Sequence, residues 1–387
     1  MKIAFVGPTY PFRGGIAHYS TVLVRHLREA GHTTRFYSYT RQYPTWLFPG
    51  STDKDPSTAA LRVECEYILD PINPLTWWQL YRKVRADNPD LLVLQWWVPY
   101  WTPFLTVLSH YIKRHTTIPL LFVCHNVVPH DGGGFLDRRL AITVLHRGDA
   151  FIVHSEQDRY RLQALLPNAN ITKMYLPTYA DVAQQGRPAD LAAARAHLGI
   201  SADCPILLFF GFVRPYKGLE YLIQAVRLVL QRRRVHLLVV GEIWNEPEFY
   251  YRYAREMGVA DAVTFVNRYV ANEELPLYFE PADVVVLPYI SATQSAVVQL
   301  AFGFGKPVIT THVGGLPEVV QDGENGLIVP PQDAEALANA IVRFLDEGLG
   351  EKFAANARRT AEAQTFAWQT LVQSIEQIQA GLGQRKA

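Results

Sequence analysis

The chain has 387 residues, of which 49% are hydrophobic and 19% charged, enough apolar material to bury the cores of two or three domains. Its 37 lysines and arginines nearly balance 36 aspartates and glutamates, and this near-neutrality argues against a nucleic-acid-binding protein. Its three cysteines lie far apart and have no metal-ligand spacing, which favours a reduced, cytosolic protein over a disulfide scaffold.

Apolar strands and amphipathic helices alternate through the first half of the chain. We predict strands at 2–7, 33–39, 90–95, 118–126 and 150–155. A helix at 16–31 ends at a glycine, and another begins at Pro74 with Asn73 as its N-cap. This order is typical of βαβ units, in which helices cover both faces of a parallel sheet.

The alternation lapses at 176–188, which we interpret as a linker, and then restarts. We predict a helix at 219–231 and strands at 205–211, 235–241, 262–267, 283–289, 307–311 and 326–330. A last helix at 366–383 carries Phe366 and Trp368 near its start, so it can pack across both halves. The pattern predicts two doubly wound α/β domains that bind ligands at the carboxyl ends of their strands, facing each other across a hinged cleft.

The apolar run at the N-terminus spans only a few residues before proline and arginine follow. We therefore interpret it as a buried strand and not as a signal peptide. No window approaches the roughly eighteen apolar residues of a membrane span. We expect a soluble protein, and contact with a membrane surface stays open.

Two glycines, Gly14 and Gly15, follow the first predicted strand and open the first helix. Glycines there let backbone N–H groups approach an anion at the positive end of the helix, although a tight turn without a ligand explains them equally well. Their spacing is not Gly-x-Gly-x-x-Gly, and no acidic residue ends the strand at 33–39. A dinucleotide-binding dehydrogenase is therefore disfavoured.

Two cations, Arg214 and Lys217, lie in the loop between the strand at 205–211 and the helix at 219–231. Cations at a helix N-terminus oppose the helix dipole, which prefers anions. A bound diphosphate would explain them, with arginine as a fork and lysine as a point charge. The alternative is a pair of solvated loop cations.

A polar loop at 291–295, free of acidic residues, leads into a helix that begins with Ser295, Ala296 and Val297. The first N–H groups of a helix have no partner inside it, so an anion can bind them directly. A helix terminus contributes about 0.3–2 kcal/mol, whereas micromolar binding needs about 8 kcal/mol. These amides, Arg214 and Lys217 would therefore have to act on one group.

Five segments together resemble one family: "RGGIAHYS", "GFVRPYKGLEYLIQA", "VTFVNRYVANEELPLYFEPADVVVLPY", "GKPVITTHVGGLPEVVQDGENGLIVPP" and "FAWQ". The chain resembles, over almost its whole length, the retaining nucleotide-sugar glycosyltransferases of family four, which have the GT-B fold. The resemblance implies two Rossmann-like domains. Residues 1–180, joined by the C-terminal helix 366–387, would receive the acceptor, and residues 181–365 would bind the nucleotide sugar.

The resemblance assigns diphosphate contacts to Gly15, with Gly14 beside it, and to Lys217. The family's usual arginine directly follows the glycine at 211, where this chain has Phe212, and Arg214 is the expected substitute.

The base of the nucleotide is expected at 267–270, which includes Tyr269. The histidine at the end of "LLFVCH", His125, resembles one near the reacting sugar. A strand-end histidine with ordinary hydrogen bonds is the alternative.

The departure from the family lies in the polar loop and the helix after it. The family has two glutamates there, at the places of Ala292 and Leu300 in this chain. Gln294 and Gln299 are the nearest polar residues that can take over their hydrogen bonds.

The resemblance implies transfer of a sugar from a nucleotide-diphosphate sugar to an acceptor hydroxyl with retention, in polysaccharide, lipid-linked glycan or glycolipid synthesis. His125, Arg214 and Lys217 would be the catalytic residues, without a protein nucleophile, cofactor or metal. The expected acceptor is a sugar or a lipid-linked glycan, and the expected place is the cytoplasm or the inner face of the membrane. The alternatives are a catalytically silent nucleotide-sugar-binding subunit and another GT-B enzyme such as an epimerase.

Three further patterns carry weaker hypotheses. Asp53-Lys54-Asp55 has the Asp-x-Asp form of a metal site, but no apolar strand leads into it, so we interpret it as a solvated loop. His130 and Asp131, before three glycines, are typical of a mobile acceptor loop or a flexible connection. A basic face for anionic lipid is one interpretation of Lys83, Arg85, Lys113 and Arg114.

Overall fold

The computed structural model describes residues 1–44, 48, 50, 52–58, 61–128, 134–183, 190–244 and 246–384. The chain divides into two compact units. The first unit comprises residues 1–55, 61–175 and 368–387, and the second comprises 56–60 and 176–367. The chain therefore passes between the units four times.

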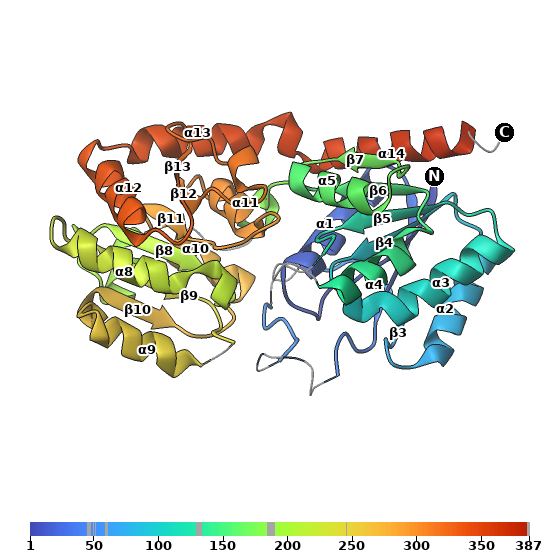
Figure 1. The fold of residues 1–387 in the computed structure, drawn as a ribbon, viewed down its shortest axis with the longest axis horizontal. Helices are drawn as coiled ribbons and strands as arrows, with labels where there is room; N and C mark the ends of the chain where they lie inside the picture. Colours follow the sequence, from blue (N-terminus) through green and yellow to red (C-terminus); the bar gives the residue numbers. More distant parts are fainter. Residues whose placement is uncertain are drawn as a thin grey trace. The chain divides into compact units, whose positions relative to one another are not determined.

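The first unit contains a sheet of seven parallel strands in the order β3-β2-β1-β4-β5-β6-β7 (Figure 1). The strands are β1 (Lys2–Val6), β2 (Thr33–Tyr39), β3 (Glu66–Leu69), β4 (Leu91–Trp96), β5 (Leu120–Cys124), β6 (Ala150–Val153) and β7 (Ile171–Lys173). The central strands β4, β5 and β6 are buried along their whole length because helices cover both faces of the sheet.

The helices of the first unit connect successive strands, and one arrives from the far end of the sequence. They are α1 (Gly15–Glu29), α2 (Pro74–Asp87), η1 (Pro99–Trp101), α3 (Thr102–His115), α4 (Phe135–Leu145), α5 (Glu156–Leu165) and α14 (Trp368–Gln384). Helices α2, α3 and α4 share one hydrophobic core with alternate residues of the central strands. Helix α14 packs against α1, where Trp368 lies 5.3 Å from the ring of Tyr19.

The second unit contains six parallel strands in the order β10-β9-β8-β11-β12-β13. The strands are β8 (Ile206–Phe210), β9 (His236–Val240), β10 (Val263–Val266), β11 (Val284–Leu287), β12 (Val308–Thr311) and β13 (Gly326–Val329). The α-helices are α6 (Ala180–Ala183), α7 (Leu191–His197), α8 (Leu219–Leu230), α9 (Pro247–Glu256), α10 (Leu275–Phe279), α11 (Ala296–Gly303), α12 (Ala334–Asp346) and α13 (Gly350–Glu362). The short 3-10 helices are η2 (Pro215–Lys217), η3 (Ala260–Ala262), η4 (Asn272–Glu274), η5 (Leu316–Glu318) and η6 (Gln364–Phe366).

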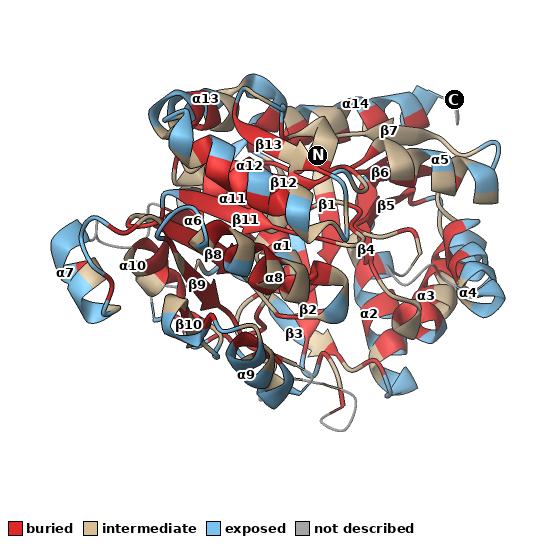
Figure 2. Ribbon diagram, turned by 60° about the vertical axis from the view of Figure 1, so that its left-hand side comes forward, coloured by how far each residue is buried: buried red, intermediate tan, exposed pale blue. Residues whose placement is uncertain are grey.

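The prediction of two doubly wound α/β domains is confirmed. Figure 2 shows the central strands of both sheets buried and the outer sides of the surrounding helices exposed. In a parallel sheet of this kind, the loops at the carboxyl ends of the strands gather along one edge. Each unit therefore presents one such edge, and the loops that carry Gly14, His125 and Lys217 lie there.

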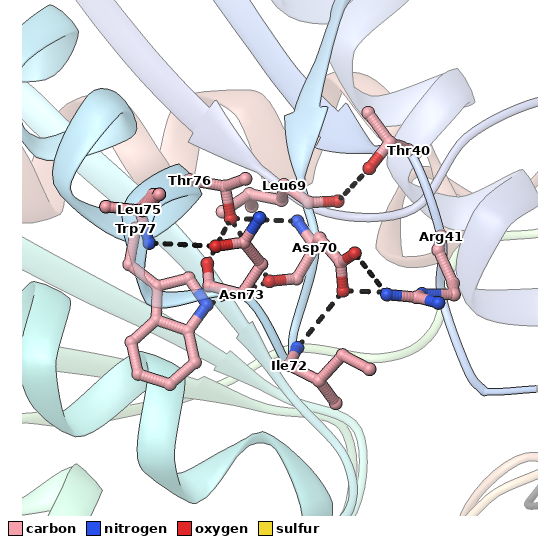
Figure 3. A network of polar contacts seen from close by, with 9 residues as sticks. All are labelled: Thr40, Arg41, Leu69, Asp70, Ile72, Asn73, Leu75, Thr76 and Trp77. Carbon is pink, nitrogen blue, oxygen red and sulfur yellow. Dashed lines mark hydrogen bonds and ion pairs between the residues drawn. The ribbon is translucent and has the colours of Figure 1, made fainter.

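The junction between β3 and α2 is held by a polar network around Asp70 (Figure 3). Its carboxylate forms an ion pair with Arg41, and its backbone carbonyl accepts a hydrogen bond from Trp77 Nε1 at 2.9 Å. Asn73 Oδ1 accepts from the backbone N–H of Leu75 at 3.1 Å, which confirms the N-cap predicted from the sequence. The network fixes where α2 begins.

None of the helices in the described ranges combines the length and apolarity needed to cross a bilayer.

Replacing Trp368 by alanine should lower the free energy of unfolding by about 3–5 kcal/mol, because a buried ring packed on Tyr19 and His26 is lost. The matched control is Trp78→Ala on α2, whose ring is half exposed, and which should cost about 1 kcal/mol or less. Urea unfolding followed by circular dichroism measures both. Equal losses would show that α14 contributes no more to the first unit than a surface side chain does.

Candidate functional site

In the first unit, the carboxyl edge of the sheet begins with the loop between β1 and α1. Gly14 is the N-cap of α1 and has a φ of 104°, which lies in the region that favours glycine. Gly15 is the first helical residue and is exposed, and the first turn carries no acidic side chain. No acidic side chain of the first turn therefore offsets the positive end of the α1 dipole.

A buried cluster of polar and aromatic side chains lies at the ends of β4, β5 and β6. His125 follows β5, and its Nε2 donates to Oε1 of Gln95, from β4, at 2.5 Å. The ring of Tyr19, from α1, meets His125 edge-on at 4.7 Å and lies 5.3 Å from His154, which follows β6. The cluster links His125 to the same helix that Gly15 opens.

Both histidines of this cluster are held neutral. Burial, with a smaller contribution from His154, keeps the pKa of His125 well below its ordinary value. Burial lowers the pKa of His154 to about 4, against the opposing effect of its hydrogen bond to the Met174 carbonyl. Within the described chain, His154 Nε2 and Gln95 Nε2 are buried without a hydrogen-bond partner. The cluster is thus a neutral hydrogen-bonding group and not a cationic one.

The interpretation of 53–55 as a solvated loop is wrong for Asp55. Its carboxylate is buried, and Oδ2 lies 3.3 Å from Nε2 of His18 on α1. The reason is backbone pairing over a long range, because the Asp55 N–H donates to the Pro11 carbonyl at 2.8 Å and the Arg13 N–H donates to the Asp53 carbonyl at 3.0 Å. Asp55 therefore belongs to the surroundings of the α1 N-terminus.

In the second unit, Lys217 ends η2, and its side chain is only 8% exposed. Its Nζ lies 5.3 Å from the ring centre of Tyr289 and faces Gly211, where an added Cβ would lie 2.9 Å from it. Among the described residues, Nζ has no carboxylate partner. Burial, with a smaller contribution from the charge of Arg214, lowers the pKa of Lys217 to about 7.

Arg214 begins a row of aromatic side chains. Its guanidinium lies 5.3 Å from the ring of Trp244, and Trp244 packs on Phe212 at 4.6 Å. Phe212 in turn lies 5.8 Å from the ring of Tyr269. Phe212, which stands where the resembling family has arginine, thus serves as a hydrophobic support between Arg214 and the predicted base-binding segment.

Helix α11 points its N-terminus at the same edge of the sheet. Ser295 is its N-cap, and the Ser295 Oγ accepts from the Val298 N–H at 3.4 Å. The backbone N–H groups of Ala296 and Val297 donate to no acceptor among the residues that the structure describes. Val297 Cγ2 would lie 3.4 Å from a Cβ on Gly211, so the helix start is next to Lys217.

The loop before α11 is held by the turn at 314–315. An added Cβ on Gly314 would lie 1.8 Å from the carbonyl oxygen of Ala292, and the Gly315 N–H donates to the Thr293 carbonyl at 2.8 Å. Only a residue without a side chain allows this approach. The Gly-Gly turn therefore sets the position of the α11 N-terminus.

Gln294 and Gln299, the two glutamines nominated from the sequence, each have a buried Oε1. Neither oxygen accepts a hydrogen bond from any residue that the structure describes. Ala292 and Leu300 are buried and apolar. The surroundings of α11 therefore offer neutral polar atoms in place of carboxylates.

The structure thus brings Arg214, Lys217, Ser295, Ala296 and Val297 to one edge of the second unit. It places Gly14, Gly15 and His125 at the corresponding edge of the first unit. The hypothesis for His130 and Asp131 lies outside the described residues. In the described ranges, no group of three or more histidine, cysteine, aspartate and glutamate residues could hold a metal ion.

Reasoning from the sequence missed three members of these sites. His154 follows a buried strand just as His125 does, and Gln95 is the single amide in an apolar strand, so both had a detectable signal. Tyr289, beside Lys217, had none, because its position depends on how the loop after β11 folds.

The second site has the donors that binding of an anion would need. A desolvated ammonium, a guanidinium and two backbone N–H groups lie at the same edge of the second sheet, and no described carboxylate pairs with either cation. A group with several anionic oxygens, such as a diphosphate, matches this set of donors.

Two domain models match the chain. Residues 204–347 match the model described as glycosyl transferases group 1, and residues 14–175 match the glycosyl transferase 4-like domain. Together they account for well over half of the chain.

Individual proteins are also similar. D-inositol 3-phosphate glycosyltransferase from Streptomyces griseus is 32% identical over 252 residues, which are 62% of this chain and 53% of that protein. The chain thus spans about half the length of such relatives.

Two solved structures share the fold. Sucrose-phosphate synthase from Thermosynechococcus elongatus has a TM-score of 0.74 and 24% sequence identity, with 99% of both chains covered. Anabaena Alr3699/HepE in complex with UDP-glucose has a TM-score of 0.74 and 19% sequence identity, with 98% of this chain and 100% of that one covered.

The buried ammonium predicts a dependence of stability on pH. The pKa of Lys217 is about 7 in the folded chain and ordinary in the unfolded chain, so between about pH 7 and 10 the unfolded state binds more protons. Stability from this group therefore rises with pH across that window. Lys217→Met should stabilise the unliganded protein by a few kcal/mol at pH 7, at about 1.4 kcal/mol per pKa unit.

The gain from Lys217→Met should shrink toward zero by pH 10, as measured by urea unfolding at several pH values. A gain that stays constant with pH would mean that the ammonium is not desolvated.

Replacing Gly314 in the turn at 314–315 by alanine should lower the free energy of unfolding through both a steric collision and backbone strain, and a control glycine separates the two effects. Gly348→Ala should lower the free energy of unfolding by about 1–2 kcal/mol. Gly314→Ala should lower it by at least twice as much. Both glycines have a positive φ, 53° and 61°, but a Cβ meets the Ala292 carbonyl only at Gly314 and meets nothing within 4 Å at Gly348. Denaturant unfolding compares the two, and equal costs would show that the loop before α11 moves freely.

Proposed function

The chain belongs to the glycosyl transferases group 1 family and has the GT-B fold, and we propose that it transfers a sugar from a nucleotide-diphosphate sugar to an acceptor hydroxyl with retention of configuration. The observation that carries this proposal is the desolvated Lys217, next to Arg214 and the start of α11, without a described carboxylate partner. A bound diphosphate would supply the missing anion.

The diphosphate gains negative charge as the bond to the sugar breaks. Lys217, Arg214 and the N–H groups of Ala296 and Val297 would stabilise that charge, each as a positioned donor or cation. The leaving diphosphate would also help to accept the proton of the acceptor hydroxyl. This route requires no protein nucleophile.

In the first unit, the neutral His125 would act as a hydrogen-bonding partner of the donor sugar or of the acceptor. Its Nε2–H is engaged by Gln95, which sets the orientation of the ring. The exposed start of α1 at Gly15 would offer its dipole to an anion.

In the second unit, the segment around Tyr269 would hold the base, and Gln294 and Gln299 would hydrogen-bond the sugars with their buried oxygens. Anabaena Alr3699/HepE was solved with UDP-glucose, which supports a nucleotide-sugar donor here.

The acceptor in this proposal is a sugar or a lipid-linked glycan, in the synthesis of a polysaccharide, lipid-linked glycan or glycolipid. The reaction would take place in the cytoplasm or at the inner face of the membrane. No cofactor or metal takes part in the proposed route.

Calorimetry with UDP, GDP and ADP at pH 8 should detect micromolar binding of one nucleotide, weakened at least tenfold in Lys217→Met. Binding of the diphosphate should return the proton to Lys217, whose pKa is about 7 in the unliganded chain. Titrations in buffers with different ionisation enthalpies should therefore show uptake of nearly one proton by the wild type and none by Lys217→Met.

Transfer itself is tested with the matching nucleotide sugar and a panel of acceptors, followed by the anomeric configuration of the product. Binding without transfer to any acceptor would favour a silent nucleotide-sugar-binding subunit, in which Ala292 and Leu300 replace catalytic carboxylates. A changed donor sugar without an acceptor would favour an epimerase. No binding of any nucleotide at millimolar concentration would overturn the proposal.

A further inference from the structure

His18 and Asp55 form a hydrogen-bonded pair at the start of α1. His18 lies in the first turn of the helix, where its backbone N–H donates to the Gly14 carbonyl at 3.2 Å. Its ring Nε2 lies 3.3 Å from Oδ2 of Asp55. A carboxylate can only accept a hydrogen bond, so Nε2 carries the hydrogen and Nδ1 keeps a lone pair. The pair therefore fixes one tautomer of the ring.

The two side chains of the pair differ in exposure. The side chain of Asp55 is 2% exposed, whereas that of His18 is 23% exposed. Nδ1 of His18 has no hydrogen-bond partner within the described ranges, yet it is not one of the side-chain atoms that are buried there without a partner. The buried carboxylate thus orients an imidazole whose second nitrogen is open to solvent.

A short backbone ribbon holds Asp55 in place. Residues 11–13 and 53–55 run antiparallel, with a bridge between Phe12 and Lys54 and the two backbone hydrogen bonds already described. Lys54 Nζ lies 3.7 Å from the centre of the Phe12 ring, which is buried. Backbone pairing and a buried ring thus fix the position of the carboxylate.

The other charged side chains of the ribbon have contacts of their own. Lys54 Nζ lies 3.6 Å from Oδ1 of Asp53, and the Arg13 guanidinium lies 5.3 Å from the ring of Phe48. The next charged side chain of α1 after His18 is Arg25, nearly two turns further along the helix. Asp55 is the charged side chain that the structure pairs with His18.

The other two histidines at this edge of the sheet are unsuited to hold a proton near neutral pH. Burial keeps the pKa of His125 well below its ordinary value and lowers that of His154 to about 4. At His18, in contrast, the neighbouring carboxylate would stabilise the imidazolium that forms when the ring takes a proton. Of these three histidines, His18 is the one whose surroundings suit a base.

We propose that His18, oriented by Asp55, takes the proton of the acceptor hydroxyl during transfer, a role that rests on the proposed function. The acceptor oxygen forms its bond to the anomeric carbon while the bond from that carbon to the diphosphate oxygen breaks. The electron pair of the broken bond stays on the diphosphate, and the proton passes to Nδ1 and from there to solvent. His18 thus completes the proton transfer that the leaving diphosphate assists. Its place at the carboxyl edge of the sheet is where folds of this kind bind ligands.

The test uses the full chain and follows release of the nucleoside diphosphate from UDP-, GDP- and ADP-glucose, with water as the acceptor. His18→Gln keeps a hydrogen-bond donor for Asp55 but cannot take a proton, so it should lower kcat about a hundredfold while KM stays within about twofold. His18→Ala should lose as much, and free imidazole should restore its kcat about tenfold, because imidazole can replace the missing ring.

Asp55→Asn tests the positioning role of the carboxylate. An amide can donate as well as accept, so it no longer fixes the tautomer of His18, and kcat should fall about tenfold or more without a response to imidazole. Asp55→Glu, which keeps the carboxylate, should recover part of this loss.

The matched control is His32→Ala. His32 Nε2 lies 2.8 Å from Oε1 of Glu376, so this is also a pair of a histidine and a carboxylate in the first unit, but it lies before β2, at the amino end of the strand. Its kcat should stay within about twofold of the wild type and should not respond to imidazole. Thermal unfolding midpoints of all variants confirm that they fold.

The outcomes separate this proposal from the proposed function. Release by the wild type with an unchanged kcat in His18→Gln, or with a change in KM alone, would overturn the role of His18 and leave the proposed function standing. A loss in His18→Ala that imidazole does not relieve, together with a lower unfolding midpoint, would show a structural pair instead. If the wild type releases no nucleoside diphosphate from any of the three donors, that result counts against the proposed function, and the role of His18 falls with it.

Discussion

A lysine ammonium buried without a described carboxylate partner is the constraint around which the second unit is organised. Such a group is unfavourable in the unliganded chain, so the surrounding structure must hold it in place. Gly211, which follows β8, has a φ of 100°, which favours glycine, and Gly218 approaches the Pro288 carbonyl so closely that an added Cβ would lie 2.2 Å from its oxygen. The Tyr216 carbonyl accepts from the Ile290 N–H at 2.7 Å, which ties the two loops together. In the proposed function, a bound diphosphate would recover the free energy stored in this arrangement.

The alternation of strands and helices was predictable because both sheets are parallel and buried on both faces, so their strands are short continuous apolar runs. The edge strands of the first sheet, β3 and β7, were not predicted. In β3 two of four residues are exposed, and β7 has only three residues, none of them fully buried. Such strands exist because a neighbour pairs with them, and their own residues carry no periodic signal. Likewise, nothing within 56–60 indicates that Ser57 accepts a hydrogen bond from the Asn272 N–H, 215 residues away.

The candidate site was predictable where a residue's position follows from its place after a strand, as for Lys217 and His125. It was not predictable where a side chain is placed by long-range contacts. Asp55 lies in a polar segment that has every local sign of solvation, yet the loop after β1 pairs with it and buries its carboxylate against His18. Phe212 shows a third case, because its role as a support for Trp244 and Tyr269 emerges only from the packing of three loops.

Helix α14 belongs to the first unit, although all of the second unit precedes it in the sequence. A ribosome therefore releases the strands of the first sheet early and the helix that covers Tyr19 last. Over the whole time that the second unit is being translated, the side of α1 that receives Trp368 has no covering helix, and transiently exposed apolar surface of this kind invites aggregation or chaperone binding. The order of assembly is thus inverted relative to the order of synthesis: the later unit can finish folding first, and the earlier one waits for the last helix.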